Sequence, residues 1–256
     1  MPTLTKEIGI IIPAHQEEEA LPQMLEELMP QARAHQCHVV VGVNGSTDQT
    51  ARLARAMHIP VAETAHAGYG YGCEAAIQLA AQKFPGLAGY LFMAADGAND
   101  PGELPLLLDP FRNENKEFIL GSRTRLMANR GVMGDAHWWS NRFLGFWSGC
   151  LSSHRFSDLG PFRLIDSRLY HRMQLQEMQY GFTIESQVLA PYFSPHLKET
   201  PVHERPRLAG KQKISGVHLG KTLRVGAEIM AAACRTRWRL RHQNPSPTHD
   251  PALPLP

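Results

Sequence analysis

The sequence has no apolar run long enough to cross a membrane. A transmembrane helix needs about 20 consecutive, mostly apolar residues, and no stretch of the 256 residues approaches that length. The N-terminus also lacks the segments of a secretory signal peptide, because residues 8–12 already have the pattern of a strand. These absences predict a cytoplasmic protein, at most peripheral on the inner face of the plasma membrane.

Cysteine is sparse, and charge of one sign is not in excess. Cys37, Cys73, Cys150 and Cys234 are widely scattered and form no Cys-x-x-Cys pair, so neither a zinc site nor a disulfide framework is predicted. A reducing compartment fits this pattern. The formal net charge of +2 gives the whole chain no strong attraction to nucleic acid. With 43% hydrophobic residues, the chain can bury one sizeable core.

Short apolar runs alternate with amphipathic stretches through the first half of the chain. Residues 8–12 and 39–43 are uniformly apolar, as strands buried on both faces are. Further strands are expected at residues 59–62, 90–95 and 118–120, and helices at 17–34, 73–83 and 101–112. Another helix is expected after Ser46, which forms a capping-box pattern with Gln49. This alternation predicts an α/β fold with a mostly parallel sheet.

The second half of the chain is expected to be less regular. Residues 123–137 have the composition of a loop, and a strand is expected to begin at Val202. A helix is predicted at residues 138–153, which contain three of the four tryptophans. This helix either belongs to the core or dips its aromatic side into a membrane interface or lipid groove. A helix at 181–191 contains one acid, Glu185, which either pairs with a base or serves a site.

The chain is expected to contain one catalytic domain and a C-terminal extension. The domain spans residues 1–216, and its last part is a basic loop at 205–215. A basic amphipathic helix is expected within 217–243, with arginines at 235, 237, 239 and 241. Residues 244–256 are rich in proline and are expected to be disordered.

The most informative position is Asp96, which directly follows the apolar run at residues 90–95. Open α/β sheets bind ligands at the carboxyl ends of their strands, and Gly97 allows a sharp turn there. Asn99 or Asp100 can cap a helix beginning at Pro101. Alone, this stretch fits a simple capped turn equally well. Likewise, Gly68-Tyr-Gly-Tyr-Gly72 is either an anion-binding segment or a flexible turn.

A series of short motifs, in this order, resembles those of family 2 glycosyltransferases with the GT-A fold. The resemblance spans residues 8–216 and is strongest to the dolichyl- or polyprenyl-phosphate sugar synthase branch. It implies a Rossmann-like, mostly parallel sheet with helices on both faces. The motifs are Ile11-Ile-Pro-Ala-His-Gln-Glu17, Val43-Asn-Gly-Ser-Thr-Asp48, Gly68-Tyr-Gly70, Ala94-Ala-Asp-Gly-Ala-Asn-Asp-Pro101, Gly121-Ser-Arg123 with Asp158-Leu-Gly-Pro-Phe-Arg163, Phe182-Thr-Ile-Glu-Ser-Gln187, and Gly210-Lys-Gln-Lys213.

The resemblance also implies roles for individual residues. The catalytic residues would be Asp96, Asp158, Glu185 and Arg123, with the two acids Asp158 and Glu185 nearest the transferred sugar. Arg123, Arg163, Arg207, Lys211 and Lys213 would bind the diphosphate or the acceptor phosphate. The nucleotide-sugar donor would contact Pro13, Ala14, Gln16, Glu17, Asn44, Gly45, Ser46, Gly68, Gly70, Ala95 and Asp96.

The sequence departs from the family pattern at three of these positions. Ala94 replaces the first acid of the Asp-x-Asp motif, Asn44 replaces an acid, and Gln212 replaces a serine. The resemblance implies Mg²⁺ or Mn²⁺ bound by Asp96, since one carboxylate with phosphate oxygens and water can hold Mg²⁺. Its affinity should be lower than that of a site with two carboxylates.

Three functions follow from the resemblance. The first is an inverting glycosyltransferase that moves a sugar from a nucleotide-diphosphate sugar to a polyprenyl-phosphate or other lipid-phosphate acceptor, with an anionic membrane surface as a candidate partner. The second is the same chemistry on a soluble phosphorylated or hydroxylated small molecule. The third is a non-catalytic relative that binds nucleotide sugar or lipid, which the changes at Ala94 and Asn44 favour.

Overall fold

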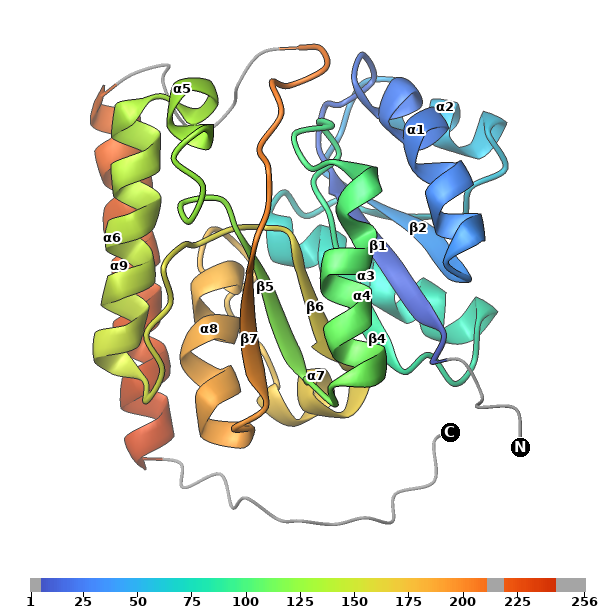
Figure 1. The fold of residues 1–256 in the computed structure, drawn as a ribbon. Helices are drawn as coiled ribbons and strands as arrows, with labels where there is room; N and C mark the ends of the chain where they lie inside the picture. Colours follow the sequence, from blue (N-terminus) through green and yellow to red (C-terminus); the bar gives the residue numbers. More distant parts are fainter. Residues whose placement is uncertain (1–5, 211–218, 243–256) are drawn as a thin grey trace.

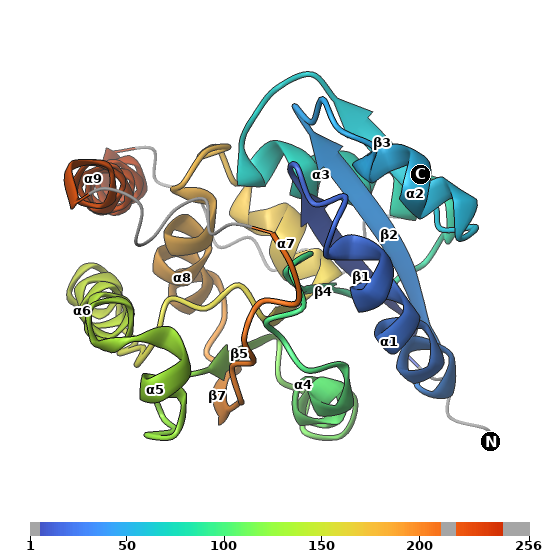
Figure 2. The same ribbon diagram turned by 90° about the horizontal axis from the view of Figure 1, so that it is seen from above.

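The computed structural model of the chain describes residues 6–210 and 219–242, in which helices cover both faces of a seven-stranded sheet (Figure 1; Figure 2). The strand order is β3-β2-β1-β4-β6-β5-β7. Only the pairings of β6 with β4 and β5 are antiparallel. The predicted α/β fold with a mostly parallel sheet is therefore confirmed. The strands are β1 Ile8–Ala14, β2 Cys37–Asn44, β3 Val61–Thr64, β4 Gly89–Phe92, β5 Phe118–Ser122, β6 Arg163–Asp166 and β7 Leu197–Pro201.

The helices form a layer on each side of the sheet. One face is covered by α1 (Leu21–Ala34), α2 (Thr50–Ala56) and α4 (Leu104–Asn113), the last preceded by the 3₁₀ turn Pro101–Glu103. The other face is covered by α3 (Tyr69–Lys83), α7 (Ser167–Met173) and α8 (Phe182–Phe193). Helices α6 (Asp135–Leu151) and α9 (Leu219–His242) pack together against α8 (Figure 2), and the short α5 is Asn129–Met133.

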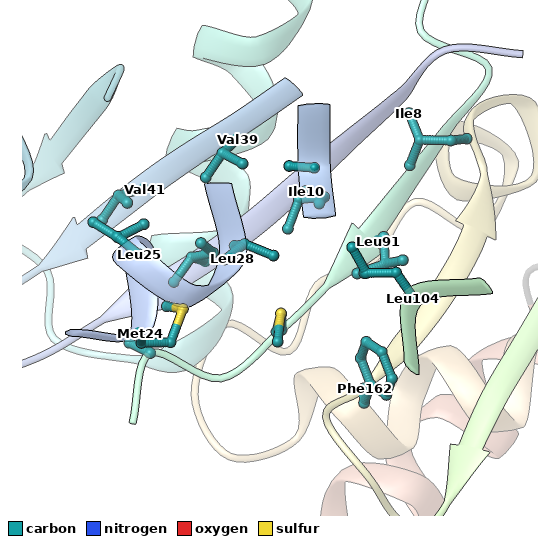
Figure 3. Close-up of a cluster of buried hydrophobic side chains, with 14 of the residues drawn as sticks. Ile8, Ile10, Met24, Leu25, Leu28, Val39, Val41, Leu91, Leu104 and Phe162 are labelled. Atoms are coloured by element: carbon teal, nitrogen blue, oxygen red, sulfur yellow. The ribbon is translucent and has the colours of Figure 1, made fainter. Parts of the chain in front are cut away.

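The alternation of side chains along the buried strands creates two apolar clusters. Ile8, Ile10 and Ile12 belong to the cluster that includes residues of α1 and α4, in which Figure 3 labels Ile8 and Ile10, whereas Ile11 contributes to the cluster on the opposite face. Each fully buried aliphatic side chain contributes about 1.5–3 kcal/mol to folding. Helix α9 also contributes to the second cluster through Ala232, Ala233 and Leu240. Among the described residues, no helix has the length and apolarity to span a membrane.

Several predicted boundaries were wrong. The helix expected from residue 17 begins at Leu21, and the stretch expected to be a loop, 123–137, contains α5 and the first turn of α6. The last strand is Leu197–Pro201 and ends before Val202. It was missed because its polar centre, Lys198-Glu-Thr200, gives no apolar run, and as the edge strand it pairs only with β5.

The predicted capping box at Ser46 was also wrong. The Ser46 hydroxyl accepts a hydrogen bond from the Gln16 backbone N–H at 2.9 Å, and the side chain of Gln49, the N-cap of α2, makes no capping hydrogen bond. The long-range contact replaces the local one, so the loop after β2 is held to the loop after β1. By contrast, the Asp100 carboxylate accepts from Gly102 N at 2.8 Å, which confirms one of the two predicted caps.

Six strands, all except β6, run in the same direction. Their carboxyl ends therefore meet at one edge of the sheet. Ligands bind at this edge in open α/β sheets, and most of the polar residues predicted to form a site lie here.

Candidate active site

The loops after β1 and β2 form the first part of the site. Pro13 and Ala14 end β1, and Asn44 ends its neighbour β2. Gln16 and Glu17 continue from β1, and the Glu17 backbone N–H donates to Thr50 Oγ1 at 2.9 Å. Together with the bond from Gln16 to Ser46, this contact makes the two loops one connected surface. The structure thus brings together the residues predicted to bind the nucleoside.

The turn after β4 presents Asp96 beside this surface. Asp96 Oδ1 accepts from Ala98 N at 3.1 Å, and Asn99 Oδ1 accepts from Ala94 N at 3.0 Å, which fixes the turn. Asp96 Oδ2 lies 3.1 Å from Nη1 of Arg207, whose Nη2 contacts Glu17. Arg207 therefore joins the carboxylates that follow β1 and β4, two adjacent strands, while Ala95 is buried beneath the turn.

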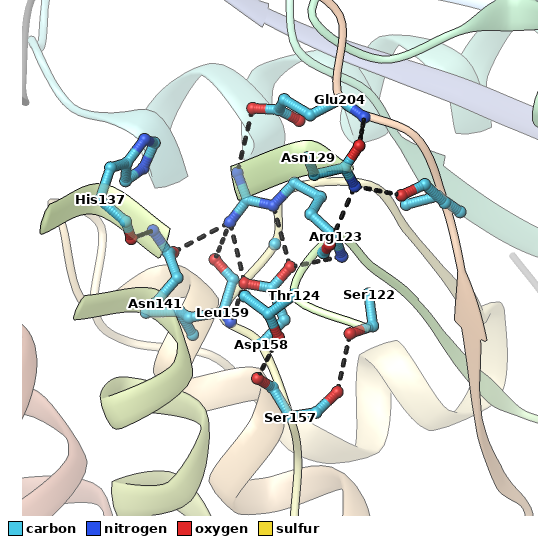
Figure 4. A network of polar contacts seen from close by, with 12 residues as sticks. Ser122, Arg123, Thr124, Asn129, His137, Asn141, Ser157, Asp158, Leu159 and Glu204 are labelled. Atoms are coloured by element: carbon cyan, nitrogen blue, oxygen red, sulfur yellow. Dashed lines mark hydrogen bonds and ion pairs between the residues drawn. The ribbon is translucent and has the colours of Figure 1, made fainter. Parts of the chain in front are cut away.

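A buried ion pair follows β5 (Figure 4). The Asp158 carboxylate accepts from Arg123 N at 2.8 Å, Nε at 2.9 Å and Nη2 at 3.0 Å, and from Leu159 N at 2.8 Å. The side chains of Arg123 and Asp158 are 5% and 0% exposed. Burial alone would raise the pKa of Asp158, but the charge and hydrogen bonds of Arg123 lower it. The pair is therefore ionised and closely constrained.

Glu204 connects the ion pair to the Asp96 turn, and the sequence reasoning missed it. Its carboxylate lies 3.4 Å from Arg123 Nη1, and its backbone forms an isolated bridge with Asn99. Burial raises the pKa of Glu204, Arg123 lowers it, and the charges of Asp158 and Asp96 raise it further. Glu204 Oε2 has no hydrogen-bond partner among the described residues. No local signal in the sequence pointed to it, because β7, the strand that precedes it, has no apolar pattern.

Two predicted site residues are enclosed by packing. Arg163 is buried and donates to Thr183 O at 2.9 Å and to Ser186 Oγ at 2.7 Å, and burial lowers its pKa to about 10. Glu185 is buried, accepts from two backbone N–H groups and pairs with Arg239 of α9. No hydrogen bond among the described residues joins either side chain to Asp96. Their proposed contacts with substrate stay predictions.

The glycines predicted to contact the donor have a structural explanation. A Cβ on Gly70 would lie 2.7 Å from Met178 Cα, and one on Gly68, where φ is 151°, would lie 2.6 Å from Met178 O. Gly45, at φ 59°, is close to Ala67. These positions need glycine for close packing, and donor contacts at them stay predictions. Lys211 and Lys213 lie outside the described residues.

The residues around Asp96 do not fit a metal site built from several protein ligands. Ala94 supplies no carboxylate, one Asp96 oxygen accepts from the backbone, and the other pairs with Arg207. Divalent Mg²⁺ is usually held by one or two carboxylates together with substrate phosphates. Within residues 6–210 and 219–242, no three His, Cys, Asp or Glu side chains cluster in a way that could hold a metal ion.

The chain is similar to several known glycosyltransferases. An uncharacterised glycosyltransferase of Mycobacterium tuberculosis and one of Mycobacterium bovis are each 27% identical to the chain over 224 residues, covering 85% of the chain and 94% of the relative. Structures of glucosyl-3-phosphoglycerate synthase from M. tuberculosis share the fold. The complex with Mn²⁺, UDP and glucosyl-3-phosphoglycerate has a TM-score of 0.63 at 16% identity, covering 91% of this chain and 80% of that one.

A second complex of that synthase, with Mn²⁺, UDP-glucose and phosphoglyceric acid, has a TM-score of 0.61 at 16% identity, with the same coverage of 91% and 80%. Residues 9–199 match the family model described as glycosyl transferase family 2, which is most of the chain. The chain therefore belongs to glycosyl transferase family 2 and is a glycosyltransferase.

Proposed function

We propose that the protein transfers a sugar, with inversion at the anomeric carbon, from a nucleotide-diphosphate sugar to a soluble phosphorylated small molecule. The observation that carries this proposal is the meeting of Glu17, Asp96 and Arg207 where adjacent parallel strands end. A soluble acceptor is supported by the similar fold of a synthase whose complex contains UDP-glucose and phosphoglyceric acid. The proposed function is therefore the second of the three that the sequence suggested, transfer to a soluble small molecule.

In this proposal, the nucleoside lies over the loops that follow β1 and β2, and the diphosphate lies near Asp96. An acceptor oxygen attacks the anomeric carbon, and the bond from that carbon to the diphosphate oxygen breaks. The nucleoside diphosphate leaves with the electron pair, while the proton of the acceptor passes to solvent. Binding both substrates in fixed positions and stabilising the leaving charge are the main contributions that the protein makes.

Mg²⁺ or Mn²⁺ at Asp96 is the cofactor that the resemblance implies, and it stays a prediction. It is supported by the Mn²⁺ and UDP in the synthase complexes. The protein ligands around Asp96 argue against a tightly bound ion, so no step of the proposed reaction depends on one.

A transfer assay tests the proposed function. UDP- and GDP-sugars would be combined with phosphoglycerate, glycerol phosphate or a polyprenyl phosphate, with Mg²⁺, Mn²⁺ or EDTA, and products detected by mass spectrometry. NMR of the product would give its anomeric configuration. Asp96→Asn should lower turnover at least about tenfold, while Asp109→Asn, at an exposed position on α4, should not. If no nucleotide sugar is transferred or hydrolysed, the non-catalytic function replaces this one.

A lipid-phosphate acceptor at an anionic membrane is a second candidate, which the outer surface of α6 favours. Trp139, Phe143 and Phe146 are 55%, 51% and 53% exposed and follow one another at helical spacing, so they form an aromatic stripe. Trp138 and Leu144 point into the protein instead. One side of this helix therefore belongs to the core, and contact of the other side with a membrane stays a prediction.

Helix α9 strengthens this candidate less than its four arginines suggest. Arg235 pairs with Glu177, and Arg239 pairs with Glu185, so these two charges are partly compensated. Arg241 is exposed, as is Trp238. The protein would sediment with anionic liposomes at low salt if this surface binds membrane. Phe143→Ser/Phe146→Ser should reduce sedimentation and leave transfer to a soluble acceptor intact. If the wild-type protein and this double variant sediment equally, the aromatic stripe is not the surface that binds membrane.

A further inference from the structure

The guanidinium of Arg207 lies between two acidic side chains at the edge of the sheet. Its Nη1 is 3.1 Å from Asp96 Oδ2, and its Nη2 contacts Glu17 Oε2. The side chains of Arg207, Asp96 and Glu17 are 19%, 26% and 9% exposed, so the contact is partly shielded from solvent. A positively charged side chain therefore lies where the loops after β1 and β4 meet.

The backbone holds this cation in place. Leu208 N donates to Asp96 O at 3.0 Å, and Arg205 N donates to Ala98 O at 2.8 Å. The Arg205 side chain also donates to Gly97 O at 3.0 Å. The segment that follows β7 is thus bonded along the whole turn after β4, which fixes where Arg207 begins. Arg207 Nε donates to Ala209 O at 2.6 Å, which orients the plane of the guanidinium.

The chemistry of this position suits a diphosphate. A guanidinium has five N–H donors in a planar fork that matches phosphate oxygens. Contacts of Arg207 with the described residues use three of them, one each on Nε, Nη1 and Nη2. Burial alone would lower the pKa of Arg207, but the hydrogen bond and charge of Glu17 and the charges of Asp96 and Glu19 raise it. The side chain therefore carries its positive charge at every physiological pH.

The protein also lacks a carboxylate at position 94, which could have helped Asp96 to bind a metal ion here. Ala94 has only a methyl group, and the oxygen of Asp96 that faces Arg207 is already paired with a cation. A metal ion bound to that oxygen would share it with the guanidinium or displace the guanidinium from it. Arg207 and a metal ion bound by Asp96 would thus compete for the same charge.

We propose that Arg207 is the resident cation of the donor site: it binds the diphosphate and stabilises the leaving nucleoside diphosphate, so donor binding needs no divalent metal ion. This inference rests on the proposed sugar transfer. When the bond between the anomeric carbon and the diphosphate oxygen breaks, the electron pair moves onto that oxygen, and N–H groups of Arg207 donate to it. Asp96 and Glu17 act as positioning residues, because they hold the guanidinium between the two loops.

Calorimetry with UDP and GDP, each in EDTA and in millimolar Mn²⁺, tests the proposal. The wild-type protein should bind UDP or GDP. Its affinity for that nucleotide in EDTA should differ from its affinity in Mn²⁺ by less than about threefold. Arg207→Gln should weaken binding in EDTA about ten- to a hundredfold, since hydrogen bonds to charged groups contribute that much. Part of this loss should be recovered in Mn²⁺, because Asp96 no longer pairs with an arginine.

Arg224→Gln is the matched control. Arg224 lies on α9, is exposed and pairs with Glu228 at 3.1 Å, so its loss removes one equal charge without touching Asp96, Glu17 or the turn after β4. Its affinity in EDTA should stay within about threefold of wild type. Thermal unfolding of each variant would establish that it is folded. Ala94→Asp keeps Arg207 and should make binding respond to Mn²⁺ by about tenfold.

The outcomes separate this inference from the proposed function. Wild-type binding that disappears in EDTA, or Arg207→Gln binding that equals wild type in EDTA, would overturn the role of Arg207 while leaving sugar transfer in place. Absence of nucleotide binding under every condition would overturn both. Binding that survives EDTA in wild type and is lost in folded Arg207→Gln supports the proposal.

Discussion

Replacing Asp158 by asparagine should destabilise the protein strongly, because it leaves Arg123 buried without its main counter-charge. The amide keeps the size of the side chain, but the carboxylate that accepts from three nitrogens of Arg123 is lost. Removing one partner of a buried pair typically costs about 3–5 kcal/mol. Glu204, 3.4 Å from Arg123, retains part of the compensation, so the lower end, about 3 kcal/mol, is expected.

Thermal or urea unfolding would measure this effect. About 3 kcal/mol corresponds to a fall in Tm of roughly 6–12 °C for a protein of this size. Glu114→Gln is the control, because Lys198 and Glu114 are 2.7 Å apart with side chains 35% and 47% exposed. That exposed pair should contribute less than about 1 kcal/mol. A Tm for Asp158→Asn within roughly 2 °C of wild type would refute the argument that the Arg123–Asp158 pair is a buried, ionised unit.

Two further predictions concern packing and pH. Gly42→Ala should destabilise the protein by about 1–3 kcal/mol or more, since the added Cβ would lie 1.9 Å from Gly72 O. Gly131→Ala is the control and should not destabilise, because no atom lies within 4 Å of the added Cβ. Equal midpoints of urea unfolding for the two variants would contradict this. Burial, and then the charge of Arg123, lower the pKa of His137 from 6.5 to about 4. The unfolded chain therefore binds the proton first, and stability present above pH 6.5 should fall as the pH drops towards 4. A pKa of His137 near 6.5 in the folded protein, measured by NMR titration, would show that this reasoning fails.

The buried parallel strands could be predicted because their signal is local. Residues 8–12 and 39–43 are uniformly apolar, and they form two neighbouring interior strands of the sheet. Asp96 could be predicted in the same way, from an acid that directly follows such a run. Edge strand β7 could not, because Lys198, Glu199 and Thr200 pair on one side only and need no apolar pattern.

The partners of the site residues depend on contacts that no local pattern reveals. Strand β7 lies at the edge of the sheet, yet the segment after it returns to the turn after β4 and delivers Glu204 and Arg207. The same holds for α6, where packing against α8 and α9 decides that Trp138 is buried while Trp139 is exposed. The family motifs predicted several of the residues that gather at this edge of the sheet, and the tertiary fold determined which charges meet there.

A crystal structure of the protein with the UDP or GDP that it binds would test the central claim most directly. The account predicts that the diphosphate lies within hydrogen-bonding distance of Arg207, beside Asp96, with the nucleoside over residues 13–17 and 44–46. Density for the nucleotide elsewhere on the protein, or a diphosphate held away from Arg207, would contradict it.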